Sequence, residues 1–270
     1  MKALVLAAGE GTRLRPLTLD KPKPMLPIAG KPLLEHTIEW LKHHGITQIA
    51  INLHHKPEAI TSHFGDGHRW GVEITYSYEN PILGTAGAIK KLEDYFDGTF
   101  VVFYGDVLTD MNLSALIEFH RKTRRAEDGN PSSVFRLPSS VFRPPSSAFR
   151  SPSSVFLLPL ATIALYRVPN PTECGIVELA PDGRITRLVE KPPPEEVFSD
   201  LASAGVMVME PGVTDFIPPD TFYDIGYHLL PDLIARGIPV YGVPIAAHEY
   251  LIDIGTPEKY ERAQYEWGRR

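Results

Sequence analysis

The chain has only one cysteine, Cys174, among its 270 residues. A single cysteine excludes a disulfide framework within the chain and a zinc site built from several thiolates. Positive charge is also scarce, because 27 lysines and arginines stand against 33 aspartates and glutamates, which gives a net charge of −6. Nothing in the overall charge therefore favours a nucleic-acid partner, and any cations that bind a ligand must be gathered locally.

Long apolar runs are missing as well. The first such run, Ala3 to Ala8, is far too short for a signal peptide or a membrane span, and glycine and charge follow it at once. We expect a cytoplasmic protein with no membrane partner. The sequence leaves the oligomeric state open, a homo-oligomer included.

Short β-type runs alternate with amphipathic stretches along the chain. The predicted strands are Lys2–Leu6, Gln48–Leu53, Glu73–Tyr78, Thr99–Tyr104, Ala161–Arg167, Gly205–Met209 and Val240–Val243. The predicted helices are Leu33–His44, Pro57–Phe64, Thr85–Tyr95, Leu113–Arg124, Ile225–Arg236 and Pro257–Trp267. This order predicts an α/β fold with an open, mainly parallel, Rossmann-like sheet and helices on both faces. Ligands of such sheets bind beyond the carboxyl ends of the strands.

Residues 131 to 159 break this rhythm with the heptapeptide repeat PSSVFRLPSSVFRPPSSAFRSPSSVFLLP. A proline in every repeat forbids a continuous helix, so the period of seven does not indicate a coiled coil. We interpret about 129–159 as an insertion into a single domain that spans 1–270. The insertion falls between a predicted helix and the next strand, which is the end of the sheet opposite the ligand crevice. A neutral insertion is the first interpretation, and a partner-docking arm is the alternative.

The stretch AAGEGTRLRPLTLDKPKPMLP, residues 7 to 27, follows the first predicted strand. Its Gly9-Glu10-Gly11 turn resembles the start of a dinucleotide fingerprint, but Leu14 stands where the third glycine belongs. No Gly-Lys-Ser/Thr of a P-loop follows either. What remains is a glycine turn whose N–H groups can cradle phosphate, with Arg13 and Lys23 close behind it. The alternative is a solvated loop whose charges are there by chance.

This stretch resembles the signature of the sugar-1-phosphate nucleotidyltransferases, G-x-G-T-R-L-x-P-L-T followed by the lysine of K-P-x-L-P. The resemblance continues in LGTAGAI (83–89), YGDVL (104–108), VEKP (189–192) and LIDIGTPEKY (251–260). Within the family, the motifs are most similar to those of the mannose-1-phosphate guanylyltransferases. Five motifs in the same order make chance agreement implausible. No hexapeptide repeats of the β-helix type follow, so we expect a catalytic domain alone.

The resemblance implies a fold of the nucleotide-diphospho-sugar transferase type and a Mg²⁺-dependent reaction. In that reaction a nucleoside triphosphate and a sugar 1-phosphate give a nucleotide sugar and pyrophosphate. The attacking phosphate oxygen is largely anionic near neutral pH, because the second phosphate pKa is about 6, so no Ser-His-Asp or Cys-His arrangement is needed. Catalysis then rests on positioning and on neutralising charge.

The family's residue roles transfer to matching positions of this sequence. Arg13 and Lys23 are the implied catalytic cations, and Asp106 and Asp253 are the implied Mg²⁺ ligands, which suits a metal that binds one or two carboxylates with water and phosphate. The implied nucleotide-binding residues are Ala8, Gly9, Gly11, Thr12, Glu79, Gly84 and Thr85. The implied sugar-phosphate-binding residues are Gly175, Glu190 and Lys191.

Glu79 bears on the choice of base. A carboxylate only accepts hydrogen bonds, and guanine offers N1–H and N2–H₂ side by side, whereas uracil and thymine set a carbonyl against it. Glu79 thus favours GTP, and the resemblance to the mannose-1-phosphate guanylyltransferases implies mannose 1-phosphate as the partner substrate. The alternatives are a glucose-1-phosphate thymidylyl- or uridylyltransferase, a Glu79 that points to solvent, and a regulatory subunit that binds nucleotide sugars without catalysis.

Overall fold

The computed structural model describes residues 1–127 and 158–270, and the insertion predicted at about 129–159 lies outside them up to residue 157. The strands are β1 (Lys2–Leu6), β2 (Pro27–Ile28), β3 (Lys31–Pro32), β4 (Gln48–Leu53), β5 (Glu73–Tyr78), β6 (Phe100–Tyr104), β7 (Val107–Thr109), β8 (Ala161–Arg167), β9 (Gly175–Leu179), β10 (Ile185–Glu190), β11 (Leu201–Met209), β12 (Val240–Pro244) and β13 (Leu251–Asp253). The helices are α1 (Leu33–His43), α2 (Pro57–Phe64), α3 (Gly84–Lys91), α4 (Leu113–Glu127), α5 (Leu230–Ala235) and α6 (Pro257–Trp267).

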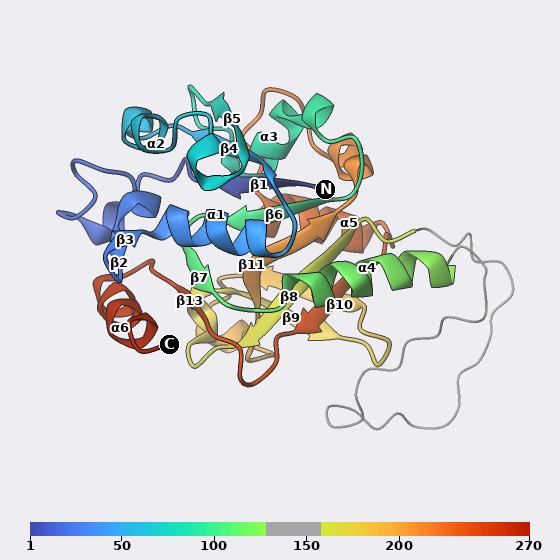
Figure 1. The fold of residues 1–270 in the computed structure, drawn as a ribbon. Coiled ribbons are helices and arrows are strands. Elements are labelled where there is room, and N and C mark those ends of the chain that lie inside the picture. Colours follow the sequence, from blue (N-terminus) through green and yellow to red (C-terminus); the bar gives the residue numbers. More distant parts are fainter. Residues whose placement is uncertain (128–157) are drawn as a thin grey trace, which may run out of the picture.

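The central sheet of the described residues has nine strands in the order β10-β9-β11-β6-β1-β4-β5, with β8 beside β11 and β12 beside β8 (Figure 1). Strands β5, β4, β1 and β6 run parallel, and β12 pairs parallel with β8. Strand β11 is antiparallel to β6 and to β8, and β9 is antiparallel to β10. The prediction of an open, mostly parallel α/β sheet is confirmed, with an antiparallel part on one side.

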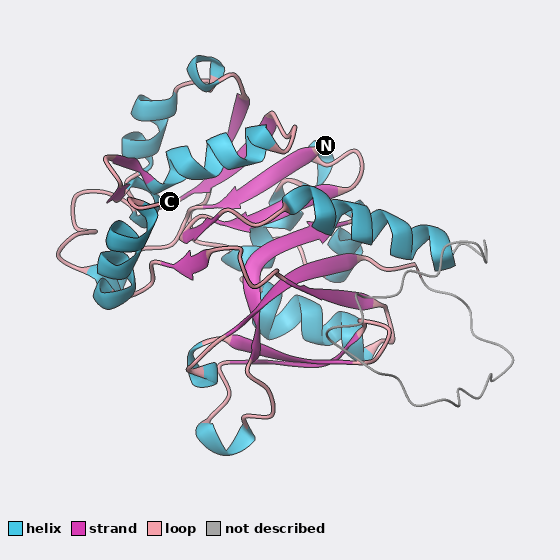
Figure 2. Cartoon of the chain, turned by 60° about the horizontal axis from the view of Figure 1, so that its bottom comes forward, coloured by secondary structure: helices cyan, strands magenta, loops and turns pink. Residues whose placement is uncertain are grey.

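Helices cover both faces of this sheet (Figure 2). On one face, α1, α2 and α4 pack against alternate strand residues such as Val5 and Phe103. On the other face, α3 and α5 pack against the intervening residues, such as Leu4 and Val102. The central strands are thus buried on both sides, which explains why they appear in the sequence as continuous apolar runs.

A smaller cluster attaches the opening loop to the end of the chain. Leu14 and Leu26 of the loop are buried with Ile252 of β13 and Ala263 of α6. The short antiparallel pair β7–β13 brings Asp253 opposite Val107, the neighbour of Asp106. Packing between two distant parts of the chain therefore places the two predicted metal ligands together.

Several predicted elements differ in detail from the structure. The predicted helix 225–236 begins as a π-helix over Ile225–Leu229 before α5, and the predicted helix 85–95 ends at Lys91 with a 3₁₀ turn over Glu93–Tyr95. Strands β2, β3, β7, β9, β10 and β13 were not predicted. β2, β3, β7 and β13 have only two or three residues, β10 is half-exposed, and β9 (GIVEL) contains a glycine and a glutamate, so all six lack the continuous apolar run that marks a buried strand.

Within the described residues, none of the helices has the length and hydropathy that a membrane crossing would require.

Candidate active site

A first pocket lies at the carboxyl ends of the parallel strands. Ala8 and Gly9 follow β1, Glu79 follows β5, and Asp106 follows β6, and all four line this pocket. Lys23 of the opening loop and Gly84 and Thr85 at the start of α3 line it too. Because parallel strands end at the same edge of a sheet, residues from four regions of the sequence converge there.

Glu79 is a buried residue of the first pocket. It is only 3% exposed, its Oε1 accepts a hydrogen bond from Asn52 Nδ2 (2.8 Å), and its Oε2 accepts one from the Leu83 backbone N–H (2.9 Å). Asn52 Oδ1 in turn accepts from the Ala7 backbone N–H at 2.7 Å. The interpretation of a solvent-facing Glu79 is therefore wrong, and its carboxylate joins the ends of β1 and β4 to the turn before α3.

A second pocket adjoins the first on the antiparallel side of the sheet. Gly175 begins β9, Glu190 ends β10, and Lys191 follows it, and all three line this pocket with Arg13 and Asp253. The carboxylate of Glu190 lies against two glycines: a Cβ atom on Gly175 would sit 2.4 Å from its Oε2, and one on Gly226 would sit 2.6 Å from it. The two glycines thus leave room for this carboxylate.

Glu190 is the acceptor best placed for a ligand in the second pocket. Among the described residues its side chain has no hydrogen-bond donor. Burial raises the pKa of its carboxyl, Lys191 opposes this, and the nearby negative charge of Asp224 adds to it. A half-buried carboxylate without a donor gains from hydroxyl groups that a ligand supplies.

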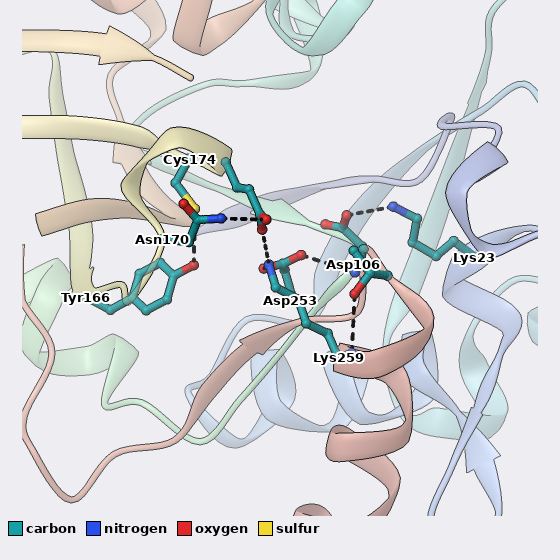
Figure 3. A network of polar contacts seen from close by, with 10 residues as sticks. Lys23, Asp106, Tyr166, Asn170, Cys174, Asp253 and Lys259 are labelled. Atoms are coloured by element: carbon teal, nitrogen blue, oxygen red, sulfur yellow. Dashed lines mark hydrogen bonds and ion pairs between the residues drawn. The ribbon is translucent and has the colours of Figure 1, made fainter. Parts of the chain in front are cut away.

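Tyr104, Asp106 and Asp224 line both pockets and mark their junction. At this junction Lys23 Nζ lies 2.9 Å from Asp106 Oδ2, and Lys259 Nζ lies 2.7 Å from Asp253 Oδ2 (Figure 3). Lys259 also lies 3.6 Å from Glu173. The junction therefore holds two lysine–aspartate ion pairs, of which Lys23–Asp106 joins the opening loop to the end of β6 and Lys259–Asp253 joins α6 to β13.

The two aspartates fit a magnesium ion. They neighbour each other across the β7–β13 pair, where the Ile254 N–H donates to the Asp106 carbonyl at 2.9 Å, and each side chain is 27% exposed. No described residue donates to Asp106 Oδ1, so it is open to a ligand. Residues 1–127 and 158–270 contain no cluster of three or more side chains suited to a metal. Two carboxylates suffice for Mg²⁺, which takes its other ligands from water and phosphate.

Arg13 and Lys191 are the cations that keep their charge available for an anionic ligand. Both line the second pocket, and neither side chain forms a salt bridge with a residue in the described ranges. Arg13 and Asp253 both lie beside Gly255, because a Cβ atom on that glycine would lie 3.1 Å from Arg13 Nη2 and 2.7 Å from Asp253 Oδ1. Lys191 adopts a positive φ of 48° directly after β10, a conformation that L-residues rarely adopt.

The structure brings most of the predicted site residues to these two pockets. Gly11 and Thr12 are the exceptions, since they line neither pocket. Gly11 has a φ of 64°, and its carbonyl accepts from the Thr18 hydroxyl at 2.8 Å, so it shapes the turn that carries Arg13. Residues that the sequence analysis missed are Asn52, Tyr104, Asp224 and Lys259. Tyr104 and Lys259 lie in the motifs YGDVL and LIDIGTPEKY, and Asp224 lies directly before the predicted helix 225–236, but the sequence analysis gave none of them a role.

Within the described residues, a glycine turn, two cations without a salt bridge and two neighbouring carboxylates lie at the carboxyl edge of an open α/β sheet, an arrangement typical of α/β proteins that bind nucleotides. Residues 2–136 and 157–269 match the family described as nucleotidyl transferase. The chain belongs to this family, which confirms the resemblance to sugar-1-phosphate nucleotidyltransferases.

Two relatives show how far this similarity extends. A UTP–glucose-1-phosphate uridylyltransferase of Synechocystis sp. is 37% identical over 97% of this chain and 62% of its own length. A mannose-1-phosphate guanylyltransferase of Mycobacterium tuberculosis is 34% identical over 96% of this chain and 62% of its own length. The chain thus spans less than two thirds of the length of these relatives.

Solved structures agree on the fold. A protein of Bacillus anthracis crystallised in complex with a sucrose aligns with a TM-score of 0.79 at 22% identity, covering 100% of this chain and 96% of that one. HddC from Yersinia pseudotuberculosis aligns with a TM-score of 0.72 at 24% identity, covering 98% of this chain and 99% of that one. At such identities the likeness concerns the fold alone.

Proposed function

We propose that this protein transfers a nucleotidyl group from a nucleoside triphosphate to a sugar 1-phosphate and releases pyrophosphate. The observation behind the proposal is the junction of two adjoining pockets, where Lys23, Asp106 and Asp253 meet. The first pocket would take the nucleotide, with its phosphates on the glycine turn after β1. The second would take the sugar phosphate, with Glu190 accepting from its hydroxyls and Lys191 facing its phosphate.

In the proposed reaction, an oxygen of the sugar phosphate attacks the α-phosphorus, and the bond from that phosphorus to the β-phosphate oxygen breaks. Arg13 and Lys23 supply positive charge next to the phosphates as negative charge shifts onto the leaving pyrophosphate. Asp106 and Asp253 would hold Mg²⁺, which when bound neutralises phosphate charge and fixes the geometry of the triphosphate. The two pockets hold the reactants together and so remove much of the entropic barrier.

GTP with mannose 1-phosphate is our first candidate pair. It is supported by the guanylyltransferase relative and by the acceptor character of Glu79, since each carboxylate oxygen keeps a lone pair beyond the bond that it accepts. UTP with glucose 1-phosphate is the second candidate. The uridylyltransferase relative and the internal hydrogen bonds of Glu79 favour it.

The test is a matrix of purified protein, Mg²⁺, each nucleoside triphosphate and several sugar 1-phosphates, with pyrophosphate release as the readout. We expect release only when both substrates are present. Asp106→Asn and Asp253→Asn should lower the rate at least about 100-fold, the loss typical of one group that stabilises a transition state. Asp97→Asn is the matched control, because Asp97 pairs with Lys2 on the surface. Near-normal rates in both site variants would refute the metal assignment, and no release from any pair would refute the function.

A further inference from the structure

Phe222 is a large apolar side chain that stays exposed in the first pocket. It lines this pocket, and it is 57% exposed. The other large apolar side chains that line the pocket, Leu6, Ile82 and Tyr104, are partly buried. Among the residues that the structure describes, no aromatic ring or cation lies over the phenyl ring of Phe222. A phenyl ring in this position gains free energy when a flat ligand covers it.

Backbone contacts fix the position of Phe222. The Tyr223 N–H donates to the Leu83 carbonyl at 2.8 Å, and the Tyr223 carbonyl accepts from the Gly87 N–H at 3.0 Å. On the other side of Phe222, the Thr221 carbonyl oxygen would lie 3.1 Å from a Cβ atom on Gly87. The residues on both sides of Phe222 thus pack against the first turn of α3, and the backbone that carries the phenyl ring is held in place.

The first pocket has one basic end, and Phe222 lies at the other. Lys23 is the only basic residue among the described residues that line this pocket, and it pairs with Asp106 just beyond β6. Glu79 follows β5, and β1 and β4 separate β5 from β6, so the two strand ends lie about 14 Å apart at the usual strand spacing. The Leu83 N–H donates to Glu79, and the Leu83 carbonyl accepts from the residue after Phe222. Phe222 therefore belongs to the Glu79 end.

We propose that Phe222 is a further nucleotide-binding residue, whose phenyl ring stacks on the base. This inference rests on the proposed function and adds to it an aromatic contact that none of the predicted site residues supplies. The phosphates are drawn to the Lys23 end of the pocket by charge, which leaves the base at the Glu79 end, beside Phe222. Every base has a flat π-face, so the ring strengthens the binding of either candidate nucleotide, and the choice between bases falls to groups that reach the edge of the base.

Calorimetry in Mg²⁺ with two probes measures this stacking. The first probe is the α,β-methylene analogue of GTP or of UTP, whichever the native protein binds more tightly. The second is inorganic tripolyphosphate, which carries the phosphates without a base. We expect Phe222→Ala to raise the dissociation constant of the analogue about 5- to 150-fold, the range typical of a base that loses an aromatic partner. The dissociation constant of tripolyphosphate should stay within about twofold of the native value, as for an ordinary surface substitution.

Two further variants separate stacking from simple apolar contact. Phe222→Leu keeps an apolar side chain without a π-face, and we expect it to bind the analogue more weakly than the native protein does. Phe222→Trp enlarges the π-face, and we expect it to bind the analogue at least as tightly as the native protein. Tyr265→Ala is the matched control, because Tyr265 of α6 is also an exposed aromatic residue and lines neither pocket. It should leave both dissociation constants unchanged.

Equal weakening of both probes in Phe222→Ala would show that the ring only supports the backbone, which would overturn the proposal. An unchanged dissociation constant of the analogue in Phe222→Ala, or native affinity in Phe222→Leu, would overturn it as well. These three results would leave the transferase proposal standing, since pyrophosphate release tests that separately. A native protein that binds neither probe would refute the proposed function and the stacking with it.

Discussion

At the scale of single residues, Glu79 differs from a surface glutamate because its carboxylate is buried and hydrogen-bonded inside the protein. Each of its oxygens already accepts one hydrogen bond inside the protein, from Asn52 and from the Leu83 N–H. A base bound in the first pocket would have to use the remaining lone pairs. The residue therefore shapes the pocket whether or not it touches the base.

Glu79→Gln tests whether Glu79 stabilises the fold through its hydrogen bonds and whether it selects the nucleotide base. The amide can accept on one side only, so its NH₂ group must face either the Asn52 amide or the Leu83 N–H. We expect the free energy of unfolding to drop by about 1–3 kcal/mol, the usual effect of one unsatisfied buried group, and the preference for GTP over UTP and dTTP to weaken. Chemical denaturation and competition assays measure the two effects, with the exposed Glu73→Gln as control. An unchanged nucleotide preference would refute base reading by Glu79, and unchanged stability would contradict the hydrogen bonds.

At the scale of elements, the start of β9 and the π-helix before α5 hold Glu190 between them. Where these two elements come closest to Glu190, each has a glycine, Gly175 in β9 and Gly226 in the π-helix, so backbone and not side chain lies against the carboxylate. The shape of the second pocket at this carboxylate thus depends on two backbones that come close together.

Gly175→Ala and Gly226→Ala should each displace the Glu190 carboxylate. A small misplacement of a binding group can cost about 100-fold, so we expect the KM for the sugar 1-phosphate to rise about tenfold or more while the affinity for the nucleotide changes little. Gly98→Ala is the matched control, since nothing lies within 4 Å of a Cβ atom there. If steady-state kinetics show that the KM values of both substrates rise equally, the assignment of Glu190 to the sugar phosphate is wrong.

A second set of elements meets at the opposite edge of the sheet around Glu210. His120 Nε2 of α4 donates to Glu210 Oε1 at 3.0 Å, the Thr99 hydroxyl donates to the same oxygen at 2.7 Å, and Arg124 Nε lies 3.4 Å away. Burial alone would raise the pKa of Glu210, but the bonds from His120 and Thr99 and the charge of Arg124 lower it below the ordinary 4.5.

This lowered pKa predicts how stability depends on pH. Because the folded pKa lies below the unfolded one, the charged carboxylate stabilises the fold above 4.5 and loses this effect as the pH falls through the folded value. The gap in unfolding free energy between the native protein and Glu210→Gln should therefore narrow as the pH drops below 4.5. Urea unfolding at several pH values above and below this range measures the difference in unfolding free energy. A difference that does not change with pH would contradict a lowered pKa of Glu210.

At the scale of the whole molecule, the points where the chain leaves and rejoins the described structure lie away from the pockets. Ala161 of β8 pairs with Met209 of β11, Met209 pairs with Phe100 of β6, and Phe100 pairs with Lys2 of β1. β8 thus begins at the edge where β1 begins, and the pockets lie at the edge where β1 ends. Arg124 Nη1 donates to the Pro159 carbonyl at 3.0 Å and ties α4 to the returning chain.

Replacing Gly129 to Leu158 by a short glycine–serine bridge should therefore leave the transferase rate within about twofold of the native value, because both ends of the deletion lie away from the pockets. The deletion keeps every described residue that lines either pocket. Pyrophosphate release and circular dichroism check the result. A folded deletion protein without activity would show that the repeat contributes to the site.

The periodicity of the sequence was enough to predict β1, β4, β5, α2 and α6 with the bounds that the structure has. Local pattern suffices there because β1 and β4 are mostly apolar runs, β5 contains β-branched and aromatic residues, and each helix has one apolar side. The loops that end β1, β5 and β6 could also be assigned to one edge, since parallel strands end together. Most of the site was thus predictable from the order of elements and from the family motifs.

The long-range contacts could not be predicted in this way. The Asn52–Glu79 bond and the Thr85–Asp224 contact join residues that lie 27 and 139 positions apart, and the sequence around each residue contains no sign of its partner. Each depends on which loop packs over which strand end, and on the antiparallel part of the sheet that short, half-exposed strands form. The motifs supply the reactive groups, and the packing of α3 against the π-helix decides how the two pockets meet, because only the folded chain brings those backbones into contact.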